Sequence, residues 1–221
     1  MKKIAYILPL IILLLFTFCG RKNIVEETPI PRMSLEDTLA FMMEEAISID
    51  SLELLSDTLP ITYLKTGYFL DSLTKTALLI QNPSDTSFSV NLYTQKENQW
   101  IKTDSISNLW GFSPQFDVKY TDYNFDGIND IFIQTSVSNG LAISRGHLLL
   151  VEPFTMKLIY QEETKELGNM TPDKENNVVY SQEAIIDNYG EWKYQNYTHE
   201  WIEGKLTVIR KDNPWDSNTK E

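Results

Sequence analysis

The sequence predicts a mainly β protein, either an antiparallel sandwich or a set of propeller-like hairpin sheets, with one N-terminal amphipathic helix. From Ile61 onward, short runs rich in aromatic and β-branched residues alternate apolar with polar side chains, which is typical of strands. The turn-forming sequences between these runs are too short to contain helical crossovers. Neighbouring strands are therefore expected to pair antiparallel.

Composition and charge restrict the class of protein. Of the 221 residues, 42% are hydrophobic and 23% are charged, which excludes a disordered chain, a collagen-like repeat and a polytopic membrane protein. The 31 acidic residues outnumber the 19 basic ones, for a formal net charge of -12. Because phosphate binding relies on clustered Lys and Arg, nucleic acid is not an expected partner.

Residues 1–18 are predicted to be a signal peptide, and Cys19 is predicted to carry a lipid. Lys2 and Lys3 precede an uncharged apolar run that is shorter than the roughly 20 residues of a spanning helix. Cys19, the only cysteine, follows at once. This order resembles bacterial lipoprotein signals, with an ordinary secretory signal or an uncleaved anchor as alternatives. Gly20 after the cysteine resembles the sorting signal for the outer membrane, on either of its faces.

The remaining chain is expected to comprise four segments. A polar, proline-containing stretch should hold the domain off the bilayer as a tether. A helical segment, one β domain and a flexible polar tail should follow it. The segments are the tether at 19–33, the helical segment at 34–59, the antiparallel β domain at 60–212 and the tail at 213–221.

The helical segment is predicted from its first residues and from its period. Ser34-Leu35-Glu36-Asp37 has the pattern of a capping box, and Pro60 marks the end of the segment. Apolar residues recur at helical spacing on one face, namely Leu35, Leu39, Met42 and Ala46. We expect this face to pack on the following sheet, with binding of a partner as the alternative.

The β domain is expected to contain short strands joined by hairpin turns such as Asn-Pro-Ser-Asp at 82–85 and Glu-Gly at 203–204. Its predicted strands are 61–65, 76–81, 87–94, 99–103, 115–120, 131–135, 146–152, 157–161, 178–182, 191–202 and 205–210.

A D-x-N-x-D-G-x-x-D motif occupies residues 122–130, between two predicted strands. Oxygen ligands at alternate positions followed by glycine allow a loop to curl around Ca²⁺, and the lack of His and Cys argues against zinc and copper. The expected ligands are the side chains of Asp122, Asn124, Asp126 and Asp130 and the carbonyl of Ile128. The motif resembles the calcium loops of FG-GAP proteins, in which the ninth-position Asp closes the shell. An ion-free turn held by Asx hydrogen bonds is the alternative.

The order of elements over residues 115–211 resembles that of bacterial periplasmic inhibitors of lysozymes. The shared features are the calcium-type loop, a small polar loop, a Pro-centred hairpin, a connection at 169–173 and a final aromatic hairpin. In those inhibitors a loop with Ser and Gly enters the lysozyme cleft. The resemblance implies a partner-binding loop, with an ordinary loop as the alternative; its residues are Ser136, Ser138, Asn139 and Gly140.

The sequence contains no G-x-S-x-G, H-E-x-x-H, P-loop or dinucleotide-binding motif. His147 and His199 lie in strand patterns, where packed or surface imidazoles are expected rather than catalytic bases. We therefore expect a non-enzymatic binding module with a structural Ca²⁺ and a protein or glycan ligand. The alternatives are an inhibitor of a lysozyme-like hydrolase, a carbohydrate-active hydrolase and a purely structural envelope component. The aromatic residues that are candidates to stack on sugars are Trp192, Tyr194, Tyr197 and Trp201, with a core or cross-strand position as the alternative.

Overall fold

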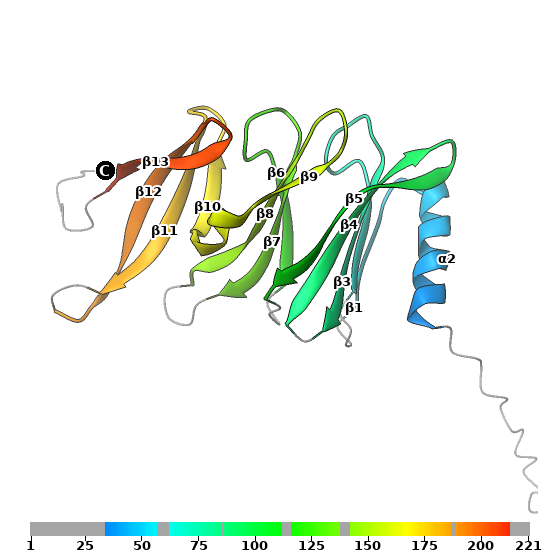
Figure 1. Cartoon of the computed structure of the whole chain (residues 1–221), viewed down its shortest axis with the longest axis horizontal. Helices are drawn as coiled ribbons and strands as arrows, with labels where there is room; N and C mark the ends of the chain where they lie inside the picture. Colours follow the sequence, from blue (N-terminus) through cyan, green and yellow to red (C-terminus); the bar gives the residue numbers. More distant parts are fainter. Residues whose placement is uncertain are drawn as a thin grey trace, which may run out of the picture. The chain divides into compact units, whose positions relative to one another are not determined.

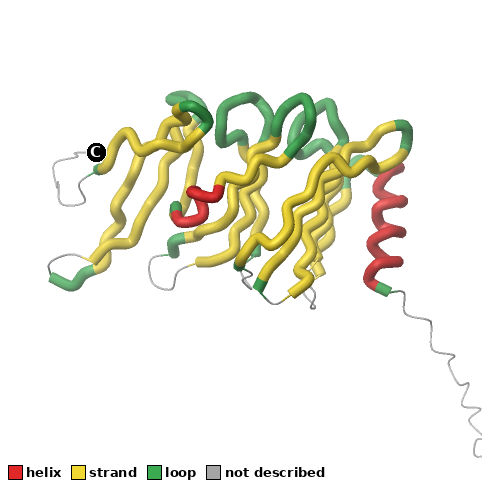
Figure 2. Tube along the Cα trace, in the orientation of Figure 1, coloured by secondary structure: helices red, strands yellow, loops and turns green. Residues whose placement is uncertain are grey.

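The computed structural model describes residues 34–56, 62–84, 86–111, 116–137, 142–186 and 189–212. Within these residues the chain forms one α-helix and three antiparallel sheets. Their order along the chain can be followed in Figures 1 and 2. This confirms the predicted mainly β class, with hairpin-built antiparallel sheets and an N-terminal helix. The predicted signal peptide, Cys19, the tether and the tail lie outside the described residues.

Within each sheet, every strand pairs with the next one along the chain, so each sheet is a simple meander. Sheet A contains β1 (Leu52–Ser56), β2 (Thr62–Gly67), β3 (Thr76–Ser84), β4 (Ser87–Lys96) and β5 (Gln99–Trp110). Sheet B contains β6 (Asp117–Thr121), β7 (Asp130–Val137), β8 (Ser144–Val151) and β9 (Leu158–Gln161), and the 3-10 helix η1 (Glu162–Glu166) follows it. Sheet C contains β10 (Gly168–Asp173), β11 (Val178–Ile186), β12 (Trp192–Ile202) and β13 (Lys205–Lys211).

Sheet B contributes apolar side chains to two different cores. Ile131 and Ile133 of β7 belong to a buried cluster shared with sheet A, which includes Phe88. Phe132, which lies between them in sequence, belongs to a second buried cluster shared with sheet C, which includes Val179. Strands buried on both faces have continuous apolar runs rather than alternating ones, and this explains the sequences of β7 and β8.

The helical prediction for 34–59 is only partly right. The helix α2 spans Leu35–Ser48, and the next segment forms strand β1 instead of a further turn of helix. Side-chain Nζ of Lys75 donates to the carbonyl oxygens of Ile47 at 3.1 Å and Ile49 at 2.6 Å. A cation bonded to the last carbonyls stabilises a helix end. A residue far along the chain thus stabilises the end of α2, and the helical spacing of apolar residues in 34–59 did not predict where this end lies.

The apolar face of α2 packs on sheet A in its central part. Leu39 is buried in a cluster with Leu64 of β2 and Leu79 of β3, and Met42 packs against this cluster. These contacts confirm the expected packing for Leu39 and Met42. Leu35, which was expected on the same face, is exposed.

Two further differences concern the strands. The connection predicted at 169–173 lies in β10, an edge strand of sheet C in which Pro172 is opposite Val179 of β11. Proline is tolerated at a sheet edge because its missing N–H need not take part in the ladder. Strand β5 is longer than the predicted 99–103 and continues to Trp110, which brings that residue to a pocket described below.

Candidate functional site: an acidic loop between three sheets and a polar pocket

The 122–130 loop connects β6 to β7 and is held in a tight curl by its own side chains. Asp122 accepts hydrogen bonds from the backbone N–H groups of Asp126, at 3.1 Å to Oδ1, and Gly127, at 3.0 Å to Oδ2. Asn124 Oδ1 also accepts from the Asp126 N–H at 3.2 Å, and Asp126 Oδ1 accepts from the Ile128 N–H at 2.9 Å. Gly127 has a φ of 92°, which a residue without Cβ adopts without strain. The motif therefore forms a tight turn closed by Asx hydrogen bonds, which is the hydrogen bonding expected for the ion-free alternative.

Asp130 occupies a different environment from the other acidic residues of the loop. It is fully buried at the start of β7, and its Oδ2 and Oδ1 accept from the backbone N–H groups of Tyr123 at 2.7 Å and Val151 at 3.0 Å. Burial raises the pKa of Asp130 to about 7, and the carboxylates of Asp126 and Asp122 also raise it, while the two backbone hydrogen bonds act in the opposite direction. Both oxygens of this carboxylate are thus already hydrogen-bonded.

The arrangement differs from a ready-made metal cage. In the described part of the chain, no group of three or more Asp, Glu, His or Cys side chains lies close enough together to hold a metal ion. Asn124 Nδ2 donates to Asp126 Oδ2 at 2.9 Å, so these two expected ligands are bonded to each other. The donor set still consists of oxygen atoms alone, which suits a hard cation such as Ca²⁺.

The loop is bonded directly to sheet A through Asn129. The backbone N–H of Asn129 donates to the carbonyl of Leu70 at 2.8 Å, and its Nδ2 donates to the carbonyl of Phe69 at 2.9 Å. Phe69 and Leu70 lie in the connection between β2 and β3. Both donors come from one residue, so the loop position determines how this connection lies against sheet B.

The loop is also bonded to sheet C. Trp201 of β12 donates from Nε1 to the carbonyl of Tyr123 at 2.7 Å, and Tyr123 is itself buried. Lys174, in the turn between β10 and β11, places its Nζ 3.6 Å from Oδ2 of Asp122. The 122–130 loop therefore joins two strands of sheet B and is bonded to residues of the other two sheets or their connections.

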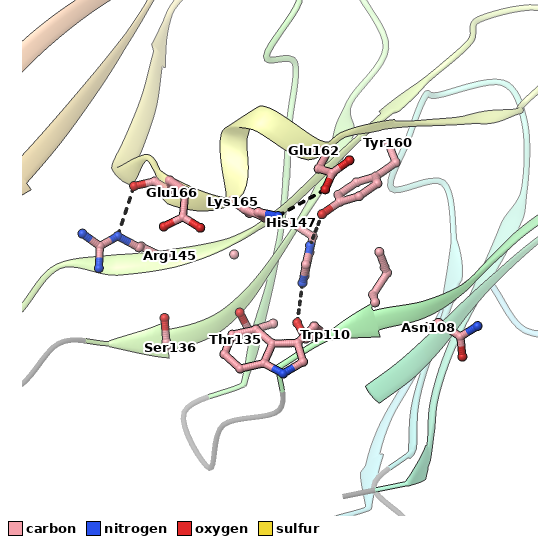
Figure 3. Close-up of a pocket in the computed structure, with 12 residues that line it drawn as sticks. Asn108, Trp110, Thr135, Ser136, Arg145, His147, Tyr160, Glu162, Lys165 and Glu166 are labelled. Carbon is pink, nitrogen blue, oxygen red and sulfur yellow. Dashed lines mark hydrogen bonds and ion pairs between the residues drawn. The ribbon is translucent and has the colours of Figure 1, made fainter. Parts of the chain in front are cut away.

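A polar pocket of about 450 Å³ lies beside sheet B (Figure 3). We call it the His147 pocket, after the buried imidazole in its wall. His147 Nδ1 lies 2.8 Å from the hydroxyl oxygen of Tyr160, and its Nε2 lies 2.6 Å from the carbonyl oxygen of Trp110. Burial lowers the pKa of His147, so the neutral imidazole is favoured. The side chain of Trp110 is 77% exposed at the same place.

The wall of the His147 pocket carries charges of both signs. Arg145 Nε donates to the carbonyl of Glu166 at 3.1 Å, and Lys165 Nζ lies 3.2 Å from Oε1 of Glu162. Ser136, one residue of the predicted partner-binding loop, also lines the pocket. The other residues of that prediction, Ser138, Asn139 and Gly140, lie outside the described residues.

Sequence reasoning did not identify this pocket. Its wall combines residues from β5, β7, β8, β9 and η1, and no local spacing links Trp110 to His147, which is 37 positions away. The one local feature in the sequence was Trp110-Gly111, in which glycine allows the positive φ that ends strand β5 next to the pocket. His199, the second histidine considered, is buried and bonded through Nε2 to Ser181 Oγ at 2.8 Å.

Comparisons with known proteins show no match to a family model, to a curated protein or to a solved structure. None of the helices within the described residues is long and apolar enough to cross a membrane.

Proposed function

We propose that this protein is a non-enzymatic binding module of the bacterial cell envelope, anchored in the outer membrane by a lipid on Cys19 and stabilised by Ca²⁺ in the 122–130 loop. The observation that carries the calcium proposal is the position of the loop, which is bonded to sheets A and C as well as to its own sheet B. An ion at this position would stabilise the relative placement of three sheets at once. Its role would be structural.

The electrostatics of the loop support a cation. Asp122, Asp126 and Asp130 bring three carboxylates into nine residues. The side chain of Lys174, which is 77% exposed, pairs with Asp122. A carboxylate has about four lone-pair positions, and Asp122 uses two of them for backbone N–H groups, so acceptor capacity remains. Binding would require Asn124 and Asp126 to exchange their mutual hydrogen bond for the ion.

The anchor and the location are supported by the N-terminal sequence. Cys19 directly follows a short apolar run preceded by Lys2 and Lys3. The acidic net charge of the chain would repel anionic lipids, so acyl chains are the expected means of attachment rather than a basic patch. Palmitate labelling of the wild type and of Cys19→Ala tests this part, and label retained by the variant would contradict it.

The calcium proposal is tested by thermal unfolding with Ca²⁺ and with chelator. If free Ca²⁺ is about ten times Kd, linkage adds about 1.4 kcal/mol, which corresponds to a rise in Tm of roughly 3–6 °C. Because extracellular calcium modules have Kd values of about 10⁻⁴ to 10⁻³ M, the titration should extend to about 10 mM. Asp126→Ala should remove the response to Ca²⁺. An equal Tm of the wild type with Ca²⁺ and with chelator would overturn the proposal.

Asp71→Ala is a matched control for the calcium experiment. The Asp71 carboxylate also accepts two backbone N–H bonds, from Leu73 and Thr74, but it lies in the connection between β2 and β3 and is not one of the expected ligands of the 122–130 loop. Its loss should lower Tm by the same amount with Ca²⁺ and with chelator. A calcium response that disappears in this variant as well would mean that the ion acts elsewhere.

A further inference from the structure

We propose that the His147 pocket binds a neutral saccharide, with one face of a sugar ring packed on Trp110 and with ring hydroxyls bonded to Tyr160, Arg145 and Glu166. This inference rests on the proposed function as a binding module and names its site and the class of its ligand. A cavity of about 450 Å³ is within the roughly 300–1,000 Å³ of small-molecule sites.

The charge of the pocket indicates a ligand without net charge. Its lining contains two cations, Arg145 and Lys165, and two anions, Glu162 and Glu166, and His147 is favoured as neutral. The charges of the pocket therefore balance, although the whole chain has a net charge of -12. An anionic ligand would face the like charges of Glu162 and Glu166, and a cationic ligand would face those of Arg145 and Lys165. A polyhydroxylated ligand can donate to the carboxylates and accept from the cations.

A chain of hydrogen bonds uses the proton of the Tyr160 hydroxyl, so the Tyr160 oxygen can accept a hydrogen bond from a ligand. The carbonyl oxygen of Trp110 can only accept, so His147 must carry its proton on Nε2 and donate it there. Nδ1 of the neutral ring is then an acceptor, and the hydroxyl of Tyr160 donates to it. This leaves the lone pairs of the Tyr160 oxygen to accept from a ligand hydroxyl. The Arg145 guanidinium uses one of its five N–H groups for the Glu166 carbonyl, so further donors remain.

The position of Trp110 supplies the apolar half of the site. Its backbone carbonyl is bonded to His147, while its indole ring is 77% exposed, and Figure 3 shows the ring beside Thr135 at the pocket. The next residue, Gly111, has a φ of 96° and lies so close to Thr135 that an added Cβ would be 3.3 Å from its Cβ. Glycine thus allows the chain to pass close to Thr135, while the ring of Trp110 stays open. The C–H face of a sugar ring is a suitable surface to cover such an aromatic ring.

The inference is tested by calorimetric titration of the purified full-length protein, in a detergent without a sugar head group. The probes are the neutral trisaccharides of glucose, mannose and N-acetylglucosamine. We expect at least one to bind with a stoichiometry of about 1:1 and a Kd in the range of about 10⁻⁵ to 10⁻³ M. Absence of binding by all three at about 10 mM would overturn the inference. Binding of a zwitterionic tripeptide or an acidic trisaccharide in preference to the neutral probes would also overturn it.

Variants place the binding in the pocket. Trp110→Ala should raise Kd about tenfold, and Trp110→Phe should keep it within about threefold, because the ring face is retained. Trp192→Ala is the matched control, since Trp192 is 59% exposed and does not line the pocket, and its Kd should equal that of the wild type. Tyr160→Phe should weaken binding about three- to tenfold. Equal affinity of Trp110→Ala and wild type would refute the site.

The calcium and saccharide experiments can fail independently. Calcium-dependent melts without saccharide binding would remove only this inference. Saccharide binding without any response to Ca²⁺ would remove the calcium proposal and leave the pocket assignment in place. Near-UV circular dichroism of every variant, compared with that of the wild type, shows whether a lost affinity comes from a lost fold.

Discussion

Replacing Asp130 by Asn removes a buried charge while keeping nearly the same shape of side chain. Asp130 accepts backbone N–H bonds on both oxygens, from Tyr123 and from Val151. The Asn amide has one acceptor oxygen and one NH₂ donor group, so one of the two buried N–H groups loses its partner. An unsatisfied buried donor costs about 1–3 kcal/mol. This is the destabilisation expected near pH 4, where the wild-type carboxyl is largely protonated in the folded protein.

The difference between the two proteins should depend strongly on pH. Burial raises the pKa of Asp130 from 3.8 to about 7, so the folded state binds a proton more tightly than the unfolded state does. The stability contributed by the protonated carboxyl is fully present below pH 3.8 and is lost as the pH rises through about 7. A shift of about three pH units at about 1.36 kcal/mol each corresponds to roughly 4 kcal/mol. Because Asn does not titrate, its cost of about 1–3 kcal/mol should be offset at about pH 4.5 to 6, and Asp130→Asn should be the more stable protein above this range.

Urea unfolding between about pH 4 and pH 8 in the presence of chelator measures this difference. Carboxylates that do not interact with Asp130 contribute equally to both proteins, so subtracting the two free energies of unfolding isolates Asp130 together with its coupling to Asp122 and Asp126. A difference that stays constant within about 0.5 kcal/mol over this range would refute the argument. If Asp130 is also a calcium ligand, excess Ca²⁺ should keep the carboxylate ionised and move the pH dependence to lower pH.

Two further predictions follow from contacts near the same loop and in sheet B. Lys174→Gln should change the free energy of unfolding by less than about 1 kcal/mol, since Lys174 is exposed. It should raise the apparent affinity for Ca²⁺, because the ammonium group no longer competes with the ion at Asp122. A calcium titration of Tm that shows a lower affinity would contradict this. Gly146→Ala should destabilise the protein by more than about 3 kcal/mol, because its Cβ would be 2.1 Å from the carbonyl oxygen of Ile133. In Gly127→Ala the added Cβ meets nothing within 4 Å, so this variant should lose only about 1 kcal/mol through backbone strain. Equal stability of the two glycine variants in urea unfolding would show that the close approach of β7 and β8 does not require glycine at position 146.

The strands of the β domain were largely predictable because they depend on local patterns. In β4, the alternation of partly buried and buried residues from Ser87 to Thr94 matches the period-2 pattern of its sequence. Strand β1 was missed because the helix was extended to the next strong breaker, Pro60, although Leu52 and Leu54 have the spacing of a strand. The pairing of β1 with β2 is a non-local contact. Strand β10 was missed because Thr-Pro-Asp is typical of a turn, and only its place at a sheet edge makes Pro172 acceptable there.

The curl of the 122–130 loop was determined by the sequence itself. Asp122, Asn124 and Asp126 bond to backbone N–H groups no more than five residues away, and Gly127 supplies the positive φ, so local chemistry is sufficient to form the turn. Only the stacking of the sheets decided what the turn touches. Asn129 reaches the carbonyl of Phe69, 60 positions away in the chain, and Tyr123 accepts from a tryptophan 78 positions away.

The same distinction applies to the buried and open aromatic groups. Sequence patterns located strands but could not tell which of their aromatic residues stay uncovered, since that depends on which sheet face lies opposite. Trp201, a candidate for stacking on sugars, packs against the core shared by sheets B and C, while Trp110 at the end of β5 is left open beside His147. Short-range hydrogen bonding and side-chain period are written in the sequence, because they involve neighbours in the chain. The pocket and the contacts between sheets arise only when distant segments pack together.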